Sequence, residues 1–369
     1  MKTRAFWRES DSDSLKCIES LMNTSTGLHR FFRMSGPRMQ MRFAELVEHE
    51  TIPRILIHGN PHVANYCKTL RGAAMVDFDR SRVGPYAYDI VRFLISVSIS
   101  KKQEGLSWLH PIILEQFRRG YMFGFLSQTT DFEEMSLLRD RAPKKWQKST
   151  NDYLESGKKW ARRLFENEVS IGQHHTRMLS DYLSNRNELS LLGPYRLALC
   201  AEIAGSMGKL HHLYLLEDRK KRLEPLLIDI KEVYEEPDNE WYHNPFDHHG
   251  TRMNVAGELY APGWELKPGR ASYGGQQYWA RQIPTQQVKI SLPLSELEQC
   301  DLCYAVGSQL GSGHSRAADK ATREAIVEDF EKRLADYLAA AAQMREELIR
   351  AHAGYVKQVH KRTFSNAAR

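Results

Sequence analysis

The sequence has no long hydrophobic run and few cysteines. Its 369 residues contain no stretch of about 18 apolar residues, the length a membrane-spanning helix needs. The opening segment MKTRAFWRESDSDSLK lacks the apolar core of a secretion signal. The five cysteines are scattered and form no disulfide framework, which is typical of a reducing compartment. We therefore expect a cytoplasmic protein with no membrane partner.

Two other classes of protein find little support. Cys300 and Cys303 form a single CxxC, and no second ligand pair stands at the spacing of a structural zinc site. The net charge is +6, with basic runs at 144–146, 158–163 and 219–222. Nucleic acid could bind such runs, but no nucleic-acid motif accompanies them and acidic residues interleave. Solvated helix faces explain the basic runs more simply.

The pattern of apolar residues predicts an α+β protein, and the length favours two lobes. We expect a helical lobe over 1–190, with short strands at 54–58 and 73–79 and an apolar helix from Ala87. A β-rich lobe follows over 191–295, with a hairpin in 195–235 and a loop over 236–275 that holds one short helix. Helices fill 296–369, and the longest, at 317–360, could pair two copies into a homodimer.

Residues 58–65, HGNPHVAN, have the spacing of a phosphotransferase catalytic loop. Phosphoryl transfer needs magnesium held by oxygen ligands and a group that orients the nucleophile. Asn65 and Asp77 are candidate magnesium ligands, since Asp77 follows the apolar run AAMV. We expect only one of Asp77 and Asp79 to face the metal, so Asp79 could orient the loop or bind a second ion. His-Gly-Asn-Pro is also ordinary turn chemistry, and any strand can end in Asp.

The segments HGNPHVAN and MVDFDRSRVGPYAYDIVRFL resemble the aminoglycoside-phosphotransferase-like branch of the protein-kinase-like superfamily. They are more similar to an uncharacterised bacterial family within it, with GDxHxxNFG, DFDE and KEA motifs. Later segments resemble that family in the same order, including GSMGKLHHLYLLE, LLIDIKEVYEE, YWARQI and AVGSQLGSGHSRA. The resemblance runs from about residue 30 to 316. It implies that Asn65 and Asp77 hold metal.

The resemblance also implies a nucleotide site made of residues far apart in the chain. Gly205, Ser206 and Gly208 would let the backbone approach phosphates closely. Lys231 would be costly to bury unpaired, and nucleotide phosphates are a natural partner. Glu258 is the candidate that positions Lys231, with Glu232 behind it. The alternative for Lys231 is a solvated lysine on an edge strand.

Other family positions carry less definite roles. Arg281 could touch phosphate or brace the site, and His314 could do either or serve in buried hydrogen bonding. Four residues of the 241–249 loop could bind zinc or simply cover the site: His243, Asp247, His248 and His249. In protein kinases the glycine loop and lysine precede the catalytic loop, whereas here they follow it. The resemblance therefore implies a circularly permuted, protein-kinase-like fold with a large helical lobe and a small antiparallel-sheet lobe.

Asn60 stands where such a loop carries Asp, and an amide cannot accept the proton of the attacking hydroxyl. We expect an ATP- and Mg²⁺-dependent phosphotransferase acting on a small molecule or peptide. His62 or Asp79 could then serve as the base. Four readings of Asn60 stay open: an introduced substitution, a slow kinase, a nucleotide-binding pseudokinase, or another reaction such as nucleotidyl transfer. A nucleic-acid-binding helical protein is a further competitor.

Overall fold

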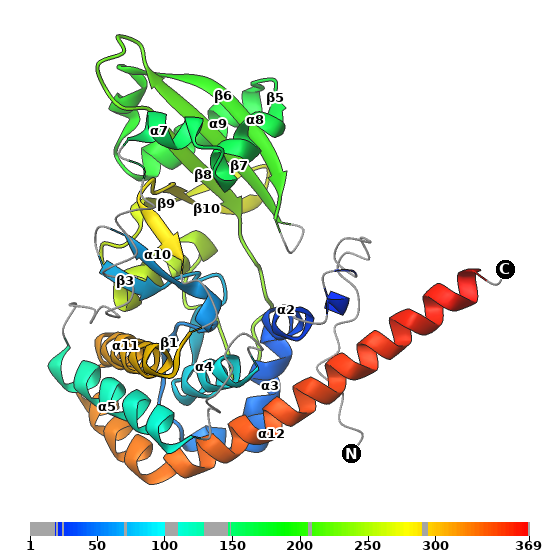
Figure 1. The fold of residues 1–369 in the computed structure, drawn as a ribbon. Coiled ribbons are helices and arrows are strands. Elements are labelled where there is room, and N and C mark those ends of the chain that lie inside the picture. The colour runs from blue at the N-terminus through cyan, green and yellow to red at the C-terminus, as the bar shows by residue number, and fades with distance from the viewer. Residues whose placement is uncertain are drawn as a thin grey trace.

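The protein consists of a part built on one large sheet and a helix-rich part (Figure 1). The computed structural model describes residues 19, 21–23, 26–69, 72–99, 110–128, 147, 149–205, 209–289 and 294–367. In Figure 1 the sheet with helices α7 to α9 forms the upper end, and α4, α5, α11 and α12 form the lower end. The mixed α+β class predicted from the sequence is confirmed.

The large sheet has six antiparallel strands in the order β5-β6-β7-β8-β10-β9. Their bounds are β5 (Glu168–Val169), β6 (Tyr195–Ala204), β7 (Leu210–Asp218), β8 (Leu226–Glu232), β9 (Leu266–Tyr273) and β10 (Gln276–Gln282). Helix α9 (Gln173–Asn185) covers one face, and α7 (Thr150–Glu155) with α8 (Lys159–Glu166) covers the other. Side chains alternate along β8, so Ile228 packs toward α9 and Leu227 toward α8.

The helix-rich part shares one hydrophobic core. Its helices are α2 (Gly27–Met34), α3 (Gly36–Leu46), α4 (Ala87–Ser98), α5 (Pro111–Ser127), α10 (His249–Tyr260), α11 (Glu296–Ala317) and α12 (Lys320–Ala367). Every residue of α4 from Ala87 to Val97 is buried, which explains why this helix has no polar face. The predicted apolar helix is confirmed.

Two small sheets carry the loops of interest. Strand β1 (Arg54–Ile57) pairs with β4 (Arg82–Pro85), and β2 (Tyr66–Thr69) lies between β3 (Gly72–Met75) and β11 (Gln287–Lys289). The loop 58–65 thus leaves β1 and enters β2. All of these pairs are antiparallel, so the end of β1 lies beside the start of β4 and the start of β2 lies beside the end of β3. The loop 58–65 and the segment after β3 are therefore close together.

Several boundaries differ from those predicted. The strand expected over 73–79 ends at Met75, and the helix expected over 317–360 begins at Lys320, after a break that separates it from α11. Strand β9 lies in the segment 236–275 that was predicted to be a loop. It contains Pro268 and Gly269, which read as loop residues, but β9 is an edge strand and edges tolerate proline.

The predicted division at residue 190 does not follow the packing of side chains. Helices α7 to α9, which precede it, bury their apolar residues against the large sheet. Strand β11, within the predicted β-rich lobe, pairs instead with β2 of the helix-rich part. Among the described helices, none is both long and apolar enough to span a membrane.

A buried glutamine connects α11 to β3. The side chain of Gln309 accepts from the amide of Met75 at 2.7 Å and donates to the carbonyl oxygens of Met75 (2.8 Å) and Tyr260 (2.9 Å). It therefore satisfies three backbone groups that lie away from solvent. This contact fixes the end of β3, from which the chain continues to Asp77.

We predict that Gln309→Leu lowers the free energy of unfolding by about 2–4 kcal/mol, because it leaves those backbone groups buried without partners. Gln343 on α12 is exposed and hydrogen-bonds only to the side chain of Glu347, so Gln343→Leu should change stability by less than about 0.5 kcal/mol. Urea unfolding measures both. Equal effects of the two substitutions would contradict the role given to Gln309.

Candidate functional site

The loop 58–65 is anchored by a single carboxylate. Asp89, in the first turn of α4, accepts from the backbone amides of His58 (2.7 Å) and Gly59 (2.8 Å). The carboxylate also contacts His314 at 3.3 Å, and His314 contacts the Tyr121 hydroxyl at 2.9 Å. All of these side chains are buried. Asp89 therefore holds the start of the loop in place, and His314 braces Asp89.

Gly59 permits the sharp turn of the chain after β1. Its φ is +79°, in the left-handed region that favours glycine. A Cβ at this position would overlap the carbonyl oxygen of Arg80. The loop and the segment 79–81 are therefore packed backbone to backbone, which only glycine allows.

Asn60 is buried and its side-chain oxygen is already occupied. Arg92 donates to Oδ1 of Asn60 from Nε (3.0 Å) and Nη2 (2.7 Å). Arg92 is itself fully buried in α4, and its guanidinium lies over the ring of Phe32 at 4.2 Å. Burial lowers the pKa of Arg92. The two donors fix which side of the amide faces Arg92 and leave Nδ2 on the other side.

His62 lies deep in the helix-rich part. Both of its ring nitrogens are buried without a hydrogen-bond partner among the described residues, and its ring packs edge-on against His29 at 5.5 Å. Burial, reinforced by the charges of Arg33 and His29, holds the pKa of His62 well below its usual value. His62 is therefore a neutral and weakly basic imidazole.

Asn65 and Asp77 lie side by side, as the sequence predicted for a pair of metal ligands. The amide nitrogen of Asn65 is 3.4 Å from Oδ2 of Asp77. Asp77 has φ of +83°, so the chain bends immediately after β3. Both Asp77 and Asp79 lie beyond the end of β3 at Met75, so strand alternation does not decide where they point, and the expectation that only one of them faces the site is wrong. Both carboxylates act on the charge of Lys231.

Lys231 reaches this bend from the end of β8. Its ammonium group forms an ion pair with Oδ2 of Asp79 and lies 5.6 Å from the centre of the Tyr234 ring. Oδ1 of Asp79 is buried and has no hydrogen-bond partner among the described residues. Arg252 of α10 donates to the carbonyl oxygens of Asp79 (3.0 Å) and Ser81, which holds the backbone of this segment in place.

The charges around the bend shift the two carboxylates in opposite directions. Burial favours the neutral acid at Asp77, but the charges of Lys231 and Arg33, with Lys289, hold its pKa below the usual range. At Asp79 burial outweighs Lys231, and the neighbouring charge of Asp77 adds to it, so its pKa is raised. The bend therefore holds one firmly ionised carboxylate beside a more basic one.

The remaining candidate residues lie at different distances from this cluster. Gly205 ends the described part of the β6–β7 hairpin, and Ser206 and Gly208 lie outside the described residues. Glu232 pairs with Lys209 at 2.7 Å, so it does not lie behind Glu258. The predicted pairing of Lys231 with Glu258 is replaced by the pairing with Asp79.

Glu258 and Arg281 face other partners. Glu258 is exposed on α10, beside a shallow surface hollow that Glu265 and Trp279 also line. Arg281 donates to both carboxylate oxygens of Glu265 at 2.8 Å. It stands opposite Asp229 in the pairing of β10 with β8, on the same face of the sheet as Lys231.

The histidine-rich loop does not gather metal ligands. His248 caps α10 and contacts Ala271 and Ser272, whereas His249 contacts Asn244 at 3.2 Å. His243 pairs with Val83 through its backbone. Cys300 and Cys303 are free thiols in α11.

Sequence reasoning missed Arg92 and Arg252, which fix the loop and the bend. A signal for Arg92 was available, because a charged side chain in an otherwise apolar helix must find a buried partner. Arg252 carried no comparable signal, since α10 has polar residues throughout its length.

A bacterial family described as "Uncharacterized protein conserved in bacteria (DUF2252)" matches residues 21–141 and 202–363. These segments make up more than half of the chain. The chain belongs to this family. The match includes the loop 58–65, the bend at Asp77 and Lys231, and it leaves out α7, α8 and α9. No curated protein and no solved structure matches the chain.

We predict that Gly59→Ala destabilises the protein by about 3 kcal/mol or more, because it adds a backbone overlap to an unfavourable φ. Gly157 also has positive φ (+64°), but a Cβ there would meet nothing within 4 Å. Gly157→Ala should therefore cost only about 1 kcal/mol. Thermal unfolding of both variants separates the overlap from the backbone strain, and similar losses would contradict the tight packing of the loop.

Proposed function

We propose that this protein is an ATP-dependent phosphotransferase with a circularly permuted, protein-kinase-like fold. The observation that carries the proposal is the meeting of Lys231 with Asp77 and Asp79, which lie about 150 positions earlier in the chain. In a kinase-like site a lysine on the sheet neutralises nucleotide phosphates, and an aspartate beside the catalytic loop holds magnesium. Here these residue types converge from two separate motifs.

The pair Asn65 and Asp77 fits magnesium, which prefers oxygen ligands. Their side chains are already within 3.4 Å of one another, and an amide flip would turn the oxygen of Asn65 toward the same point as Oδ2 of Asp77. A bound magnesium ion would offset the charge of the transferring phosphate.

The surroundings of the bend fit a polyphosphate. Arg33 and Lys289 come from α2 and β11 and act on Asp77 together with Lys231, so three elements direct positive charge to one place. Lys231 stays protonated, because Asp79 and Asp77 outweigh its burial and raise its pKa. A nucleotide phosphate could share Lys231 with Asp79, and the hairpin at Gly205 would lie over it.

Asp79 is the residue of this site best suited to accept a proton. Its Oδ1 has no partner among the described residues, and burial raises its pKa above that of an ordinary carboxylate. Asn60 lacks a basic atom, and His62 is a weak base. We propose that Asp79 receives the hydroxyl proton of a small-molecule or peptide acceptor. A cytoplasmic location fits this proposal, since ATP is present there and thiols such as Cys67 and Cys200 stay reduced.

A nucleotide-binding pseudokinase is the second candidate, and one observation favours it. Arg92 holds the side-chain oxygen of Asn60 with two hydrogen bonds, in the place where an aspartate would be needed for catalysis. Such a protein would bind nucleotide through Lys231 and Asp77 without transferring phosphate.

We predict that the full-length protein binds ATP with magnesium, and that Asp77→Asn weakens this binding at least tenfold but weakens binding of metal-free ATP much less. Lys231→Met should weaken both, because it removes charge that faces the phosphates. Titration calorimetry with and without magnesium measures each affinity. Transfer of label from γ-labelled ATP to components of a cell lysate measures the reaction.

Two further variants make this result interpretable. Lys231→Met combined with Asp79→Asn avoids an unpaired buried carboxylate, so a loss of binding without unfolding can be recognised. Lys267 is another ion-paired lysine of the same sheet, bound to Glu188 at 3.1 Å, and Lys267→Met should leave ATP binding unchanged. The proposal fails if the wild-type protein binds no nucleotide, or if Asp77→Asn and Lys231→Met bind as the wild type does.

We predict that Asn60→Asp folds at least as stably as the wild type, because a carboxylate beside Arg92 completes a buried ion pair. If the missing base limits the reaction, label transfer should rise by about 100-fold or more, within the range that a positioned base provides. Melting temperature and transfer rate are measured on the same preparation. A stable variant that binds ATP and transfers nothing would favour the pseudokinase.

A further inference from the structure

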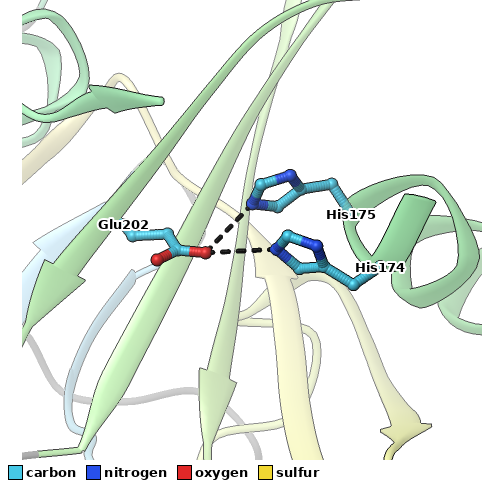
Figure 2. A group of neighbouring side chains, drawn as sticks. All are labelled: His174, His175 and Glu202. Carbon is cyan, nitrogen blue, oxygen red and sulfur yellow. Dashed lines mark hydrogen bonds and ion pairs between the residues drawn. The ribbon is translucent and has the colours of Figure 1, made fainter. Parts of the chain in front are cut away.

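A second cluster of ionisable side chains lies on the other face of the large sheet. Figure 2 shows His174 and His175, from the first turn of α9, pointing at Glu202 of β6. Oε1 of Glu202 lies 3.3 Å from Nε2 of His174 and 3.1 Å from Nε2 of His175. In the described part of the chain, no other three His, Cys, Asp or Glu side chains bring their ligand atoms within 4.8 Å of one another.

The sheet separates this cluster from the site around Lys231. Glu202 pairs with His212 across β6 and β7, so the two side chains share a face. The preceding residue, His211, pairs with Lys231 across β7 and β8 and contacts Asp229 on the opposite face. His174 and His175 also lie outside the two segments that match the bacterial family.

The side chain of His212 is a second, independent observation that points to a ligand at this cluster. Its side chain is only 5% exposed, and Nδ1 has no hydrogen-bond partner among the described residues. Nδ1 lies 3.6 Å from Oε1 of Glu202, beyond hydrogen-bonding distance but directed at the same oxygen. Three imidazoles therefore surround one carboxylate oxygen. One of them, His212, is buried, and its Nδ1 has no hydrogen-bond partner among the described residues.

The ligand atoms of His174, His175 and Glu202 all lie within 4.8 Å of one another, so a small shift of these side chains would let one ion bind all three. Zinc bound at about 2.0–2.1 Å in a tetrahedron holds its ligand atoms about 3.3 Å apart. The nitrogen–oxygen distances in the cluster are 3.1, 3.3 and 3.6 Å. Imidazole nitrogens with one carboxylate favour zinc and similar transition metals, whereas magnesium and calcium prefer oxygen throughout.

We propose that His174, His175 and Glu202 bind a zinc ion, and that His212 lies beside the ion without being one of its three closest ligands. The ion would join the first turn of α9 to β6 and so stabilise the packing of α9 on the sheet. The side chains of His174 and Glu202 are 40% and 33% exposed, so an ion can reach the site from solvent. This proposal does not depend on the proposed phosphotransferase activity.

Zinc binding has a structural consequence at the start of α9. Nδ1 of His175 accepts a hydrogen bond from the amide of Gly172 at 3.0 Å, so Nε2 carries the ring proton and donates it to Glu202. When Nε2 binds zinc, the neutral ring must carry its proton on Nδ1, and the Gly172 contact is lost. The amide of Gly172 should therefore exchange with solvent faster in the zinc-bound protein, whereas amides in the middle of α9 should exchange more slowly.

The test uses the full-length protein, freed of metal by a chelator, and zinc chloride as the probe. Calorimetry should give one tight site, and the melting temperature should rise with zinc concentration. His174→Ala and Glu202→Gln should each weaken binding at least tenfold. Both should fold, since His174 is partly exposed and glutamine keeps the shape of Glu202.

The matched control is His243→Ala, which removes an exposed histidine on the loop between β8 and α10. It should bind zinc as the wild type does, which separates the cluster from weak binding by the 15 histidines of the chain. A tenfold excess of magnesium should not displace the zinc. Equal zinc affinity in the wild type, His174→Ala and Glu202→Gln would overturn the proposal, as would a wild-type protein that melts at the same temperature with and without zinc.

Discussion

The ion pair between Lys231 and Asp79 joins the large sheet to the segment that follows β3. Both side chains are largely buried, and a charge buried without a partner costs several kcal/mol, about 3–5 when one member of a pair is removed. The pair therefore fixes where the end of β8 lies relative to the bend at Asp77. Arg252 adds to this by donating to the backbone carbonyl oxygen of Asp79. The backbone that carries the Asp79 side chain therefore cannot move away from Lys231 without losing this hydrogen bond. Asp77 adds a second carboxylate at this bend, and Arg33 and Lys289 act on it together with Lys231.

The parts of this arrangement that sequence could predict are those set by local patterns. The apolar run of α4, the hairpin of β7 and β8, and the closeness of Asn65 to Asp77 follow from periodicity and spacing. The bend at Asp77 does not, because positive φ at an aspartate is imposed by its tertiary surroundings. The pairing of Lys231 with Asp79 depends on tertiary packing, because Asp79 lies beyond the end of β3 and meets the end of β8 only in the folded chain. Glu258 was predicted as the partner of Lys231 from the resemblance to kinase-like sites, which does not include this contact.

Arg92 determines where the side chain at position 60 lies. An arginine inside an apolar helix needs acceptors, and the side-chain oxygen of Asn60 supplies one that receives two of its hydrogen bonds. Aspartate at the same position would accept the same two bonds and add charge. The location of the group at position 60 is therefore set by Arg92, whichever of the two residues is present. What differs is the chemistry of one atom, an amide nitrogen in place of a carboxylate oxygen. The loop keeps its shape when the basic atom is absent, because Asp89 holds its backbone and Arg92 holds the side-chain oxygen at position 60.

Adjacent histidines of β7 contribute to different clusters of ionisable side chains on the two faces of the large sheet. His211 and His212 are adjacent in β7, and alternation sends the first toward Asp229 and Lys231 and the second toward Glu202. Strands β6, β7 and β8 pack apolar residues on both faces, so a slip of one residue would exchange the histidines and bury polar groups in each core. Strand β7 takes part in both pairings: its register with β8 places His211 opposite Lys231, and its register with β6 places His212 opposite Glu202. A ligand that tightens the pairing of β6 with β7 on one face would therefore stabilise the position of Lys231 on the other without contacting it.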